Sequence, residues 1–224
     1  MEQSTVVVAP TRHVLAVLPH APLGMAAEAR LRRLRSPADR DDFTAARLLA
    51  AYALRAAGAG EVSPVDLRQR CEVCGGQHGL PLAVAGRHVS WSHAAGWVAA
   101  GTSWSRLGVD VEADSEVKLA DALTPAERAL IGAAADPARA FRLAWTAKEA
   151  CVKAGVARLD GFAALEVLTT PDALRPSHAG LLLSSRSVPG AIAAAATVEP
   201  ARWATLGDRG ELIPVPDRGV GRRA

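Results

Sequence analysis

The sequence lacks any run of 18 apolar residues, and its N-terminus lacks the pattern of a signal peptide. We therefore expect neither a membrane span nor secretion. Its three cysteines are an odd number and give no disulfide framework, which favours a reducing cytoplasm. The net charge of +3 is small for 224 residues. Because nucleic-acid-binding domains usually carry a strong basic stripe, we expect no nucleic-acid partner.

Lysine is absent from the first half of the chain. Residues 1–105 hold 11 arginines, no lysine and 8 acidic residues, whereas residues 106–224 hold 15 basic and 15 acidic residues. Such a mild, local excess of arginine fits a phosphate site better than a nucleic-acid surface, since the guanidinium group matches phosphate geometry.

The two halves of the chain resemble each other. RSPADR (35–40) resembles LTPAER (123–128), and residues 41–58 resemble residues 139–155. The offset grows from 88 to 98 residues between the two matches, which indicates an insertion between two helices of the second half. Internal similarity of this kind is a signature of duplicated architecture.

The duplication predicts the same succession of elements in each half: a strand, a short helix, a long helix and a later strand pair. The predicted strands are 13–19, 88–101, 106–113, 164–170 and 190–198. We expect an α+β fold with two similar subdomains around a pseudo-twofold axis and the active site in the cleft between them. The expected units are residues 1–105, residues 106–212 and a loose tail over 213–224.

Both short helices have a recognisable start. Thr124-Pro125-Ala126-Glu127 is a capping box with proline at the first helical position, and Ser36-Pro37-Ala38-Asp39 is its weaker counterpart. Glu127 is therefore interpreted as a helix cap rather than as a catalytic residue.

The strand GVDVEAD (108–114) carries carboxylates on one face. Asp110 and Glu112 lie on the face opposite Val109 and Val111, roughly 7 Å apart along the strand. Neighbouring carboxylates repel unless a cation lies between them, and Mg²⁺ takes such ligands together with waters and phosphates. The alternative is an amphipathic strand with one solvated face. We prefer the metal interpretation because the equivalent strand of the first half, 13–19, has no acidic residue.

The long helix predicted between Pro137 and Gly155 offers a third carboxylate, Glu149. Glu149 and Lys153 also form an ordinary i,i+4 pair, which would explain both without a function. Lys148 is different, because it lies within the apolar stripe of this helix. A lysine there either reaches the edge of the stripe or faces a buried anion, and we interpret it as a ligand of a metal-bound phosphate.

Ser92 and His93 end the predicted strand of VSWSHAAGW (89–97). A Ser-His hydrolase is disfavoured, because adjacent strand residues point to opposite faces and no G-x-S-x-G elbow is present. His93 is better suited to donate to a phosphate oxygen, and the alternative is a hydrogen-bonded histidine near the surface.

Two arginines of the first long helix, Arg40 and Arg47, are two helical turns apart and share a face. Both could bind a phosphate. Arg47 stands out because the residues after it are apolar. The upstream run Arg30 to Arg35 is interpreted as a solvated basic face.

The segment CEVCGGQHG (71–79) contains Cys71, Cys74 and His78, which make half of a zinc site. No second ligand pair follows at the spacing of a zinc finger, and His88, His93 and Cys151 are the remaining candidates. A loop turn with reduced thiols is the alternative.

Taken together, these motifs resemble the 4′-phosphopantetheinyl transferases, specifically the larger pseudodimeric type that activates carrier proteins of peptide and polyketide synthases. The resemblance lies in GVDVE (108–112), WTAKEACVK (145–153), VSWSHA (89–94) and GLP (79–81), and it extends from about residue 12 to 170.

The resemblance implies that coenzyme A binds between the halves and that its phosphopantetheine passes to a serine of an apo carrier protein, leaving 3′,5′-ADP. It also implies Mg²⁺ as the metal, and Mn²⁺ would accept the same oxygen ligands. We expect a monomer, because the duplication already supplies both sides of the cleft. The implied metal ligands are Asp110, Glu112 and Glu149, and the implied catalytic residues are Glu149, Lys153 and Asp110. The implied coenzyme A contacts are Arg40, Arg47, Gly79, Leu80, Ser92, His93, Lys148 and Lys153.

Two positions depart from the family pattern. Leu80 stands where many relatives have lysine, and Ala94 stands where serine or threonine is frequent.

Two other functions are alternatives to phosphopantetheine transfer. A Mg²⁺-dependent nucleotide pyrophosphatase would use the three carboxylates without a protein acceptor. A zinc-containing module would bind nucleic acid through the Arg30–Arg40 run, against which the near-neutral second half argues.

Overall fold

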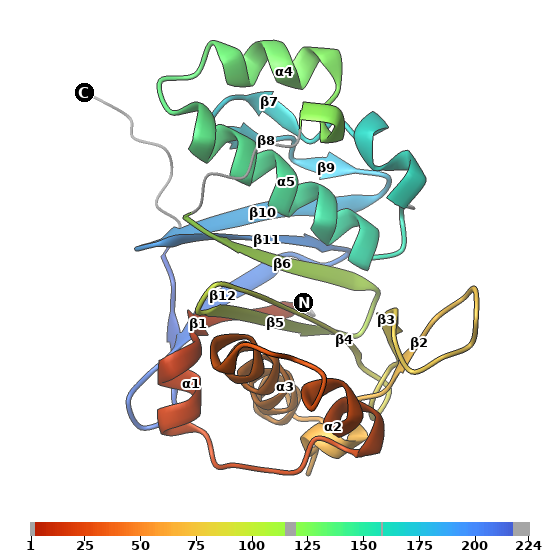
Figure 1. Ribbon diagram of the computed structural model, residues 1–224. Helices are drawn as coiled ribbons and strands as arrows, with labels where there is room; N and C mark the ends of the chain where they lie inside the picture. The colour runs from red at the N-terminus through yellow and green to blue at the C-terminus, as the bar shows by residue number, and fades with distance from the viewer. Residues whose placement is uncertain (1–2, 115–119, 158, 217–224) are drawn as a thin grey trace.

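Two sheets and the helices that cover them form four layers in the computed structural model (Figure 1). The structure describes residues 3–114, 120–157 and 159–216. None of the helices in these ranges is both long and apolar enough to span a membrane. The helices are α1 (Thr11–Val17), α2 (Met25–Leu31), α3 (Pro37–Ala56), α4 (Pro125–Gly132) and α5 (Pro137–Lys153). The predicted α+β class is thereby confirmed, while the pseudo-twofold relation of the halves remains a prediction.

The first sheet has the strand order β13-β12-β1-β5-β4. Its strands are β1 (Ser4–Pro10), β4 (His88–Ala94), β5 (Trp97–Ser103), β12 (Ala201–Leu206) and β13 (Leu212–Pro214). β1 pairs in parallel with β12, and the other pairs are antiparallel. Residues 201–214, expected in the second half and the tail, therefore complete the sheet of the first half. Residues 217–224 of the predicted tail lie outside the described residues.

The second sheet is antiparallel, with the strand order β6-β11-β10-β9. Its strands are β6 (Leu107–Ala113), β9 (Ser177–His178), β10 (Leu181–Val188) and β11 (Ala191–Thr197). The four remaining strands form two short antiparallel pairs. β2 (Gln69–Arg70) pairs with β3 (Leu80–Pro81). β7 (Leu168–Thr170) pairs with β8 (Ala173–Leu174).

Apolar side chains fill the three spaces between the four layers. Leu49 and Leu54 of α3 are buried with Val7 of the first sheet. Val109 and Val111 of β6 are buried between the sheets, and Leu143 of α5 is buried against the second sheet. This packing confirms that the valines of GVDVE point away from the two acidic residues, so the carboxylates face α5.

The predicted helix between Pro137 and Gly155 is confirmed as α5, and the predicted strand 106–113 is confirmed as β6. Thr124 and Glu127 form the expected capping box at the start of α4. In the first half the predicted short and long helices are one continuous helix, α3. The reason is local: residues 38–56 contain no proline or glycine, whereas Gly132 and Pro137 separate α4 from α5.

The predicted strand 13–19 is wrong, because most of this segment is the helix α1. Val14 and Leu18 are both buried, which is the i,i+4 spacing of a helix rather than the alternation of a strand. The strand of this region is β1, and its sequence STVVVAP also lacks acidic residues. The contrast with the carboxylate-bearing β6 therefore holds for β1.

Candidate functional site

A glycine brings α5 close to β6 at the carboxylate strand. A Cβ atom at Gly108 would lie 1.9 Å from the carbonyl oxygen of Ala150 and 2.5 Å from the backbone nitrogen of Ala154. Only glycine allows this approach. The close packing sets the side chains at the C-terminal end of α5 directly over the acidic face of β6.

Asp110 lies at the centre of this contact and is 3% exposed. Its Oδ1 accepts a hydrogen bond from Ser92 Oγ at 2.6 Å and pairs with Lys153 Nζ at 2.5 Å. Lys153 Nζ also donates to Ser92 Oγ at 2.9 Å. Asp110 Oδ2 is buried and has no hydrogen-bond partner among the described residues. A buried carboxylate oxygen without a partner is costly, so this atom is a candidate ligand for a cation.

Glu112 and Glu149 flank Asp110. Burial and the charge of Asp110 raise the pKa of Glu112 to about 7, although Trp145 Nε1 donates to its Oε1 at 3.0 Å. Burial and Asp110 also raise the pKa of Glu149. The negative charge of Asp110 therefore acts on both neighbouring carboxylates. The oxygens of the three carboxylates do not all lie within 4.8 Å of one another. Asp110 is paired with Lys153, and Glu112 accepts from Trp145.

We expect Glu112→Gln to stabilise the protein at about pH 8 in EDTA and to leave it unchanged near pH 4.5. The folded-state pKa of Glu112 is raised, so the folded state binds the proton more tightly than the unfolded state. The charge of Glu112 therefore destabilises the folded state only at higher pH. This destabilisation is absent below the ordinary pKa of 4.5, grows as pH rises and is complete above about pH 7.

Melting temperatures across this pH range measure the effect. The exposed Glu61→Gln is the matched control and should follow the wild type at every pH. Equal melting curves for Glu112→Gln and the wild type at about pH 8 would contradict the expectation.

A cavity of about 240 Å³ opens beside Lys153 and Ser92. Side chains of α2, α3, β2, β4 and α5 line it: Arg30, Phe43, Arg47, Gln69, Trp91, Ser92, His93 and Lys153. The lining carries three fixed cations, and Lys153 and Ser92 belong both to the cavity and to the Asp110 contact. A negatively charged group bound in the cavity would therefore lie next to the carboxylates.

Arg47 is the most deeply placed cation of the cavity. It is 4% exposed, and its guanidinium carbon lies 3.5 Å from the centroid of the Phe43 ring. It donates to the carbonyl oxygen of Phe43 at 3.1 Å and to Gln69 Oε1 at 3.3 Å. Burial and the nearby charge of Arg30 lower the pKa of Arg47 to about 9. Two arginines brought together in this way favour an anion between them.

His93 lines the cavity at the end of β4, with its ring edge-on to Phe43 at a centroid distance of 6.4 Å. Desolvation and the charges of Arg47 and Lys153 lower its pKa, and the charge of Asp42 opposes them. A neutral imidazole can donate a hydrogen bond to a phosphate oxygen.

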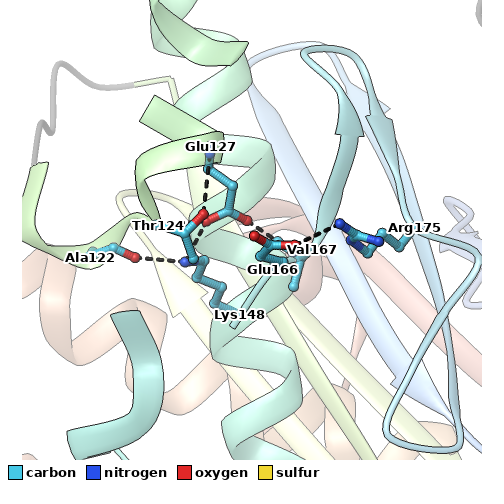
Figure 2. A network of polar contacts seen from close by, with 7 residues as sticks. All are labelled: Ala122, Thr124, Glu127, Lys148, Glu166, Val167 and Arg175. Atoms are coloured by element: carbon cyan, nitrogen blue, oxygen red, sulfur yellow. Dashed lines mark hydrogen bonds and ion pairs between the residues drawn. The ribbon is translucent and has the colours of Figure 1, made fainter. Parts of the chain in front are cut away.

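Lys148 lies elsewhere, and its predicted contact with a nucleotide needs correction. Its side chain is fully buried, and its Nζ pairs with Glu127 Oε2 at 2.7 Å and donates to the Ala122 carbonyl at 2.8 Å (Figure 2). Glu127 also accepts from the backbone N–H groups of Val167 and Thr124. Lys148 is about 100° from Glu149 around the helix, so it faces α4 while Glu149 faces β6. The buried anion that its position required is a protein carboxylate.

Three other predicted contacts do not line the cavity. Arg40 is exposed, and its Nε donates to the carbonyl oxygen of Leu34 at 2.9 Å. Gly79 is connected to the cavity through Gln69, whose Nε2 donates to the Gly79 carbonyl at 2.7 Å. The Leu80 side chain lies near Gly155, at the end of α5.

Four cavity residues, Arg30, Phe43, Gln69 and Trp91, were not expected from the sequence. Arg30 belongs to a run of arginines, and only its position on α2 above Phe43 distinguishes it from its neighbours. Gln69 lies in the two-residue strand β2 between two arginines, and the sequence around it contains no signal for its role.

Part of the chain matches a known protein family. No curated protein matches the sequence. Residues 106–183 match the family model of the 4′-phosphopantetheinyl transferase superfamily. The matched segment contains β6 and α5, with Asp110, Glu112, Glu149 and Lys153. This segment of the chain is therefore similar to the 4′-phosphopantetheinyl transferase superfamily.

Proposed function

We propose that this protein transfers 4′-phosphopantetheine from coenzyme A to a serine of an apo acyl or peptidyl carrier protein. Holo carrier protein and 3′,5′-ADP are the products. The observation that carries the proposal is the continuity between the cationic cavity and the carboxylates, through Lys153 and Ser92. The superfamily match over 106–183 supports the reaction type. The proposal includes the larger pseudodimeric type, acting as a monomer in the cytoplasm on carriers of polyketide or nonribosomal-peptide synthases.

The carboxylates fit a divalent cation. Asp110 Oδ2 is buried without a partner in the described residues, and burial together with the negative charge of Asp110 raises the pKa values of Glu112 and Glu149. Oxygen donors of this kind suit Mg²⁺ or Mn²⁺. Asp110, Glu112 and Glu149 would hold the ion, which when bound neutralises charge on the pyrophosphate of coenzyme A.

The cations of the cavity would bind and orient the phosphates of coenzyme A. Arg47 and Arg30 suit the 3′-phosphate, and neutral His93 can donate to a phosphate oxygen. Lys153 faces the carboxylates and the cavity at once, so it would neutralise charge that develops on the leaving phosphate. Phosphoryl transfer depends mainly on such positioning and charge neutralisation.

Glu149 is proposed as the base for the carrier serine. Its raised pKa makes it a better proton acceptor near neutral pH than an ordinary carboxylate. The serine oxygen would form a bond to the phosphorus next to pantetheine, and the bond from that phosphorus to the bridging oxygen would break. The serine proton would pass to Glu149, and 3′,5′-ADP would leave with the bridging oxygen.

The test is intact-mass spectrometry of an apo carrier protein incubated with coenzyme A, Mg²⁺ and this protein. We expect the carrier to gain the mass of one phosphopantetheine and 3′,5′-ADP to appear in equal amount. EDTA should abolish both. A carrier in which the acceptor serine is replaced by alanine is the control and should gain nothing.

A different outcome would identify the rival hydrolase. Steady cleavage of coenzyme A without modification of any of several carriers would replace the transferase by a Mg²⁺-dependent phosphohydrolase that uses the same carboxylates. Retention of full transfer in EDTA would contradict the metal site instead.

A further inference from the structure

The loop between β2 and β3 holds three potential metal ligands that the proposed reaction does not use. One ligand atom each of Cys71, Cys74 and His78 lies within 4.8 Å of the other two. Cys74 Sγ and His78 Nε2 are 3.1 Å apart. With Zn–S near 2.3 Å and Zn–N near 2.0–2.1 Å, the edges of a zinc tetrahedron are about 3.3–3.8 Å. In the described part of the chain this is the one group of at least three such ligands that converges so closely.

The backbone of the loop is folded around the first cysteine. The N–H of Gly75 donates to the Cys71 carbonyl at 2.9 Å, and the N–H of Cys71 donates to the Gly76 carbonyl at 2.9 Å. These two backbone hydrogen bonds hold the turn that carries Cys71 and Cys74.

Two glycines make this conformation accessible. Gly75 directly follows Cys74 and has a φ of +69°, in the region that favours glycine. A Cβ atom at Gly76 would lie 3.2 Å from Cys74 Sγ and 3.2 Å from His78 Cδ2, so a larger residue would crowd the ligands. The loop therefore has the turn hydrogen bonds and the space that a metal-binding loop needs.

We propose that Cys71, Cys74 and His78 bind a zinc ion, with water in the fourth position. Two thiolates and an imidazole select zinc over the hard cations that suit the carboxylate site. Cys74 and His78 are exposed, so water can reach the ion. The bound zinc closes the loop between two strands of two residues each, a hairpin too short to be stable by itself.

The zinc loop also supports one wall of the cavity. Gly79 follows His78, and its carbonyl accepts from Gln69 Nε2, while Gln69 Oε1 accepts from Arg47. Fixing the loop therefore fixes Gln69 and, through it, the guanidinium of Arg47. This consequence for coenzyme A binding rests on the proposed function, whereas the zinc site itself does not.

The experiment measures zinc in the full chain purified under reducing conditions and follows Co²⁺ titration by its thiolate-to-cobalt charge-transfer absorption. We expect one equivalent of zinc and a saturable cobalt spectrum with thiolate character. Cys74→Ser and His78→Ala should weaken cobalt binding at least about a hundredfold, since changes outside the ligand shell already cost about 10–100-fold. Cys151→Ala and His20→Ala, which remove a buried thiol and an exposed imidazole outside the loop, should bind as the wild type does.

Each other outcome overturns the zinc site. If the reduced wild-type chain contains no zinc and shows no thiolate-to-cobalt charge-transfer band, the zinc site is wrong. This result does not depend on whether the loop variants fold. A Cys71–Cys74 disulfide in the native mass, with no metal bound after reduction, would replace the site by a redox pair.

Coenzyme A binding tests the coupling to the cavity separately. Removal of the zinc is expected to weaken coenzyme A binding roughly fivefold, about the value of one hydrogen bond. If zinc binds as expected but no coenzyme A binding is detected in either form, the proposed function fails and the zinc site stands. If coenzyme A binds equally with and without zinc, only the coupling fails.

Discussion

Asp110→Asn is expected to reduce the rate of phosphopantetheine transfer by a factor on the order of 10³, since the loss of even one preorganised donor to a transition state costs about 10²–10³. The change keeps the size of the side chain and the acceptor for Ser92. It removes the negative charge at Oδ2, the candidate metal ligand, and the partner of Lys153. The loss should appear mainly in kcat, because these contacts act on the charge that moves during transfer.

The measurement is holo carrier formation over time, with Mg²⁺ dependence recorded for both proteins. Asp114→Asn is the matched control, since Asp114 directly follows β6 and its exposed side chain pairs with Arg142. We expect near wild-type activity for this variant. Full activity of Asp110→Asn, with unchanged Mg²⁺ dependence, would remove Asp110 from the metal site.

Lys148→Met is expected to destabilise the protein without changing its affinity for coenzyme A. Removing one partner of a buried ion pair leaves an uncompensated charge and costs about 3–5 kcal/mol. Here that charge is Glu127, which is 1% exposed. At about 2–4 °C per kcal/mol for a chain of this size, the melting temperature should fall by roughly 10 °C.

A double variant separates charge from packing. Glu127→Gln removes the negative charge and keeps an oxygen that accepts from the Val167 N–H, so adding it to Lys148→Met should recover part of the lost stability. Thermal melts measure the stability, and coenzyme A titration below the transition measures binding. A normal melting temperature with a large loss of coenzyme A affinity would restore Lys148 to the nucleotide site.

Local sequence was sufficient for the elements that carry the carboxylates. The alternation of GVDVE placed Asp110 and Glu112 on one face of a strand, and the proline, glycine and apolar spacing around 137–155 delimited α5. These features depend on residues within a few positions of one another. For the same reason the capping role of Glu127 could be predicted from Thr124 and Pro125.

Partners distant in the chain were decided by the tertiary structure. The apolar run at 13–19 suits a strand or a helix, and packing of Val14 and Leu18 selects the helix. β12 joins β1 across nearly the whole chain, which no local pattern indicates. The sequence marks Lys148 as needing a buried anion, but only the packing of α4 on α5 identifies that anion as Glu127.

The same distinction applies to the cavity and to the zinc loop. The spacing from Arg47 favoured Arg40 over Arg30 as a cavity residue, but the position of α2 over Phe43 brings Arg30 to the cavity and leaves Arg40 outside it. The spacing of Cys71, Cys74 and His78 suggested half of a zinc site, and the folded loop brings their ligand atoms together. Sequence alone determined which residues can carry charge, bind metal or turn the chain. Which of these residues contact one another depended on packing. Segments that are far apart in the chain carry no local sequence signal that they will meet.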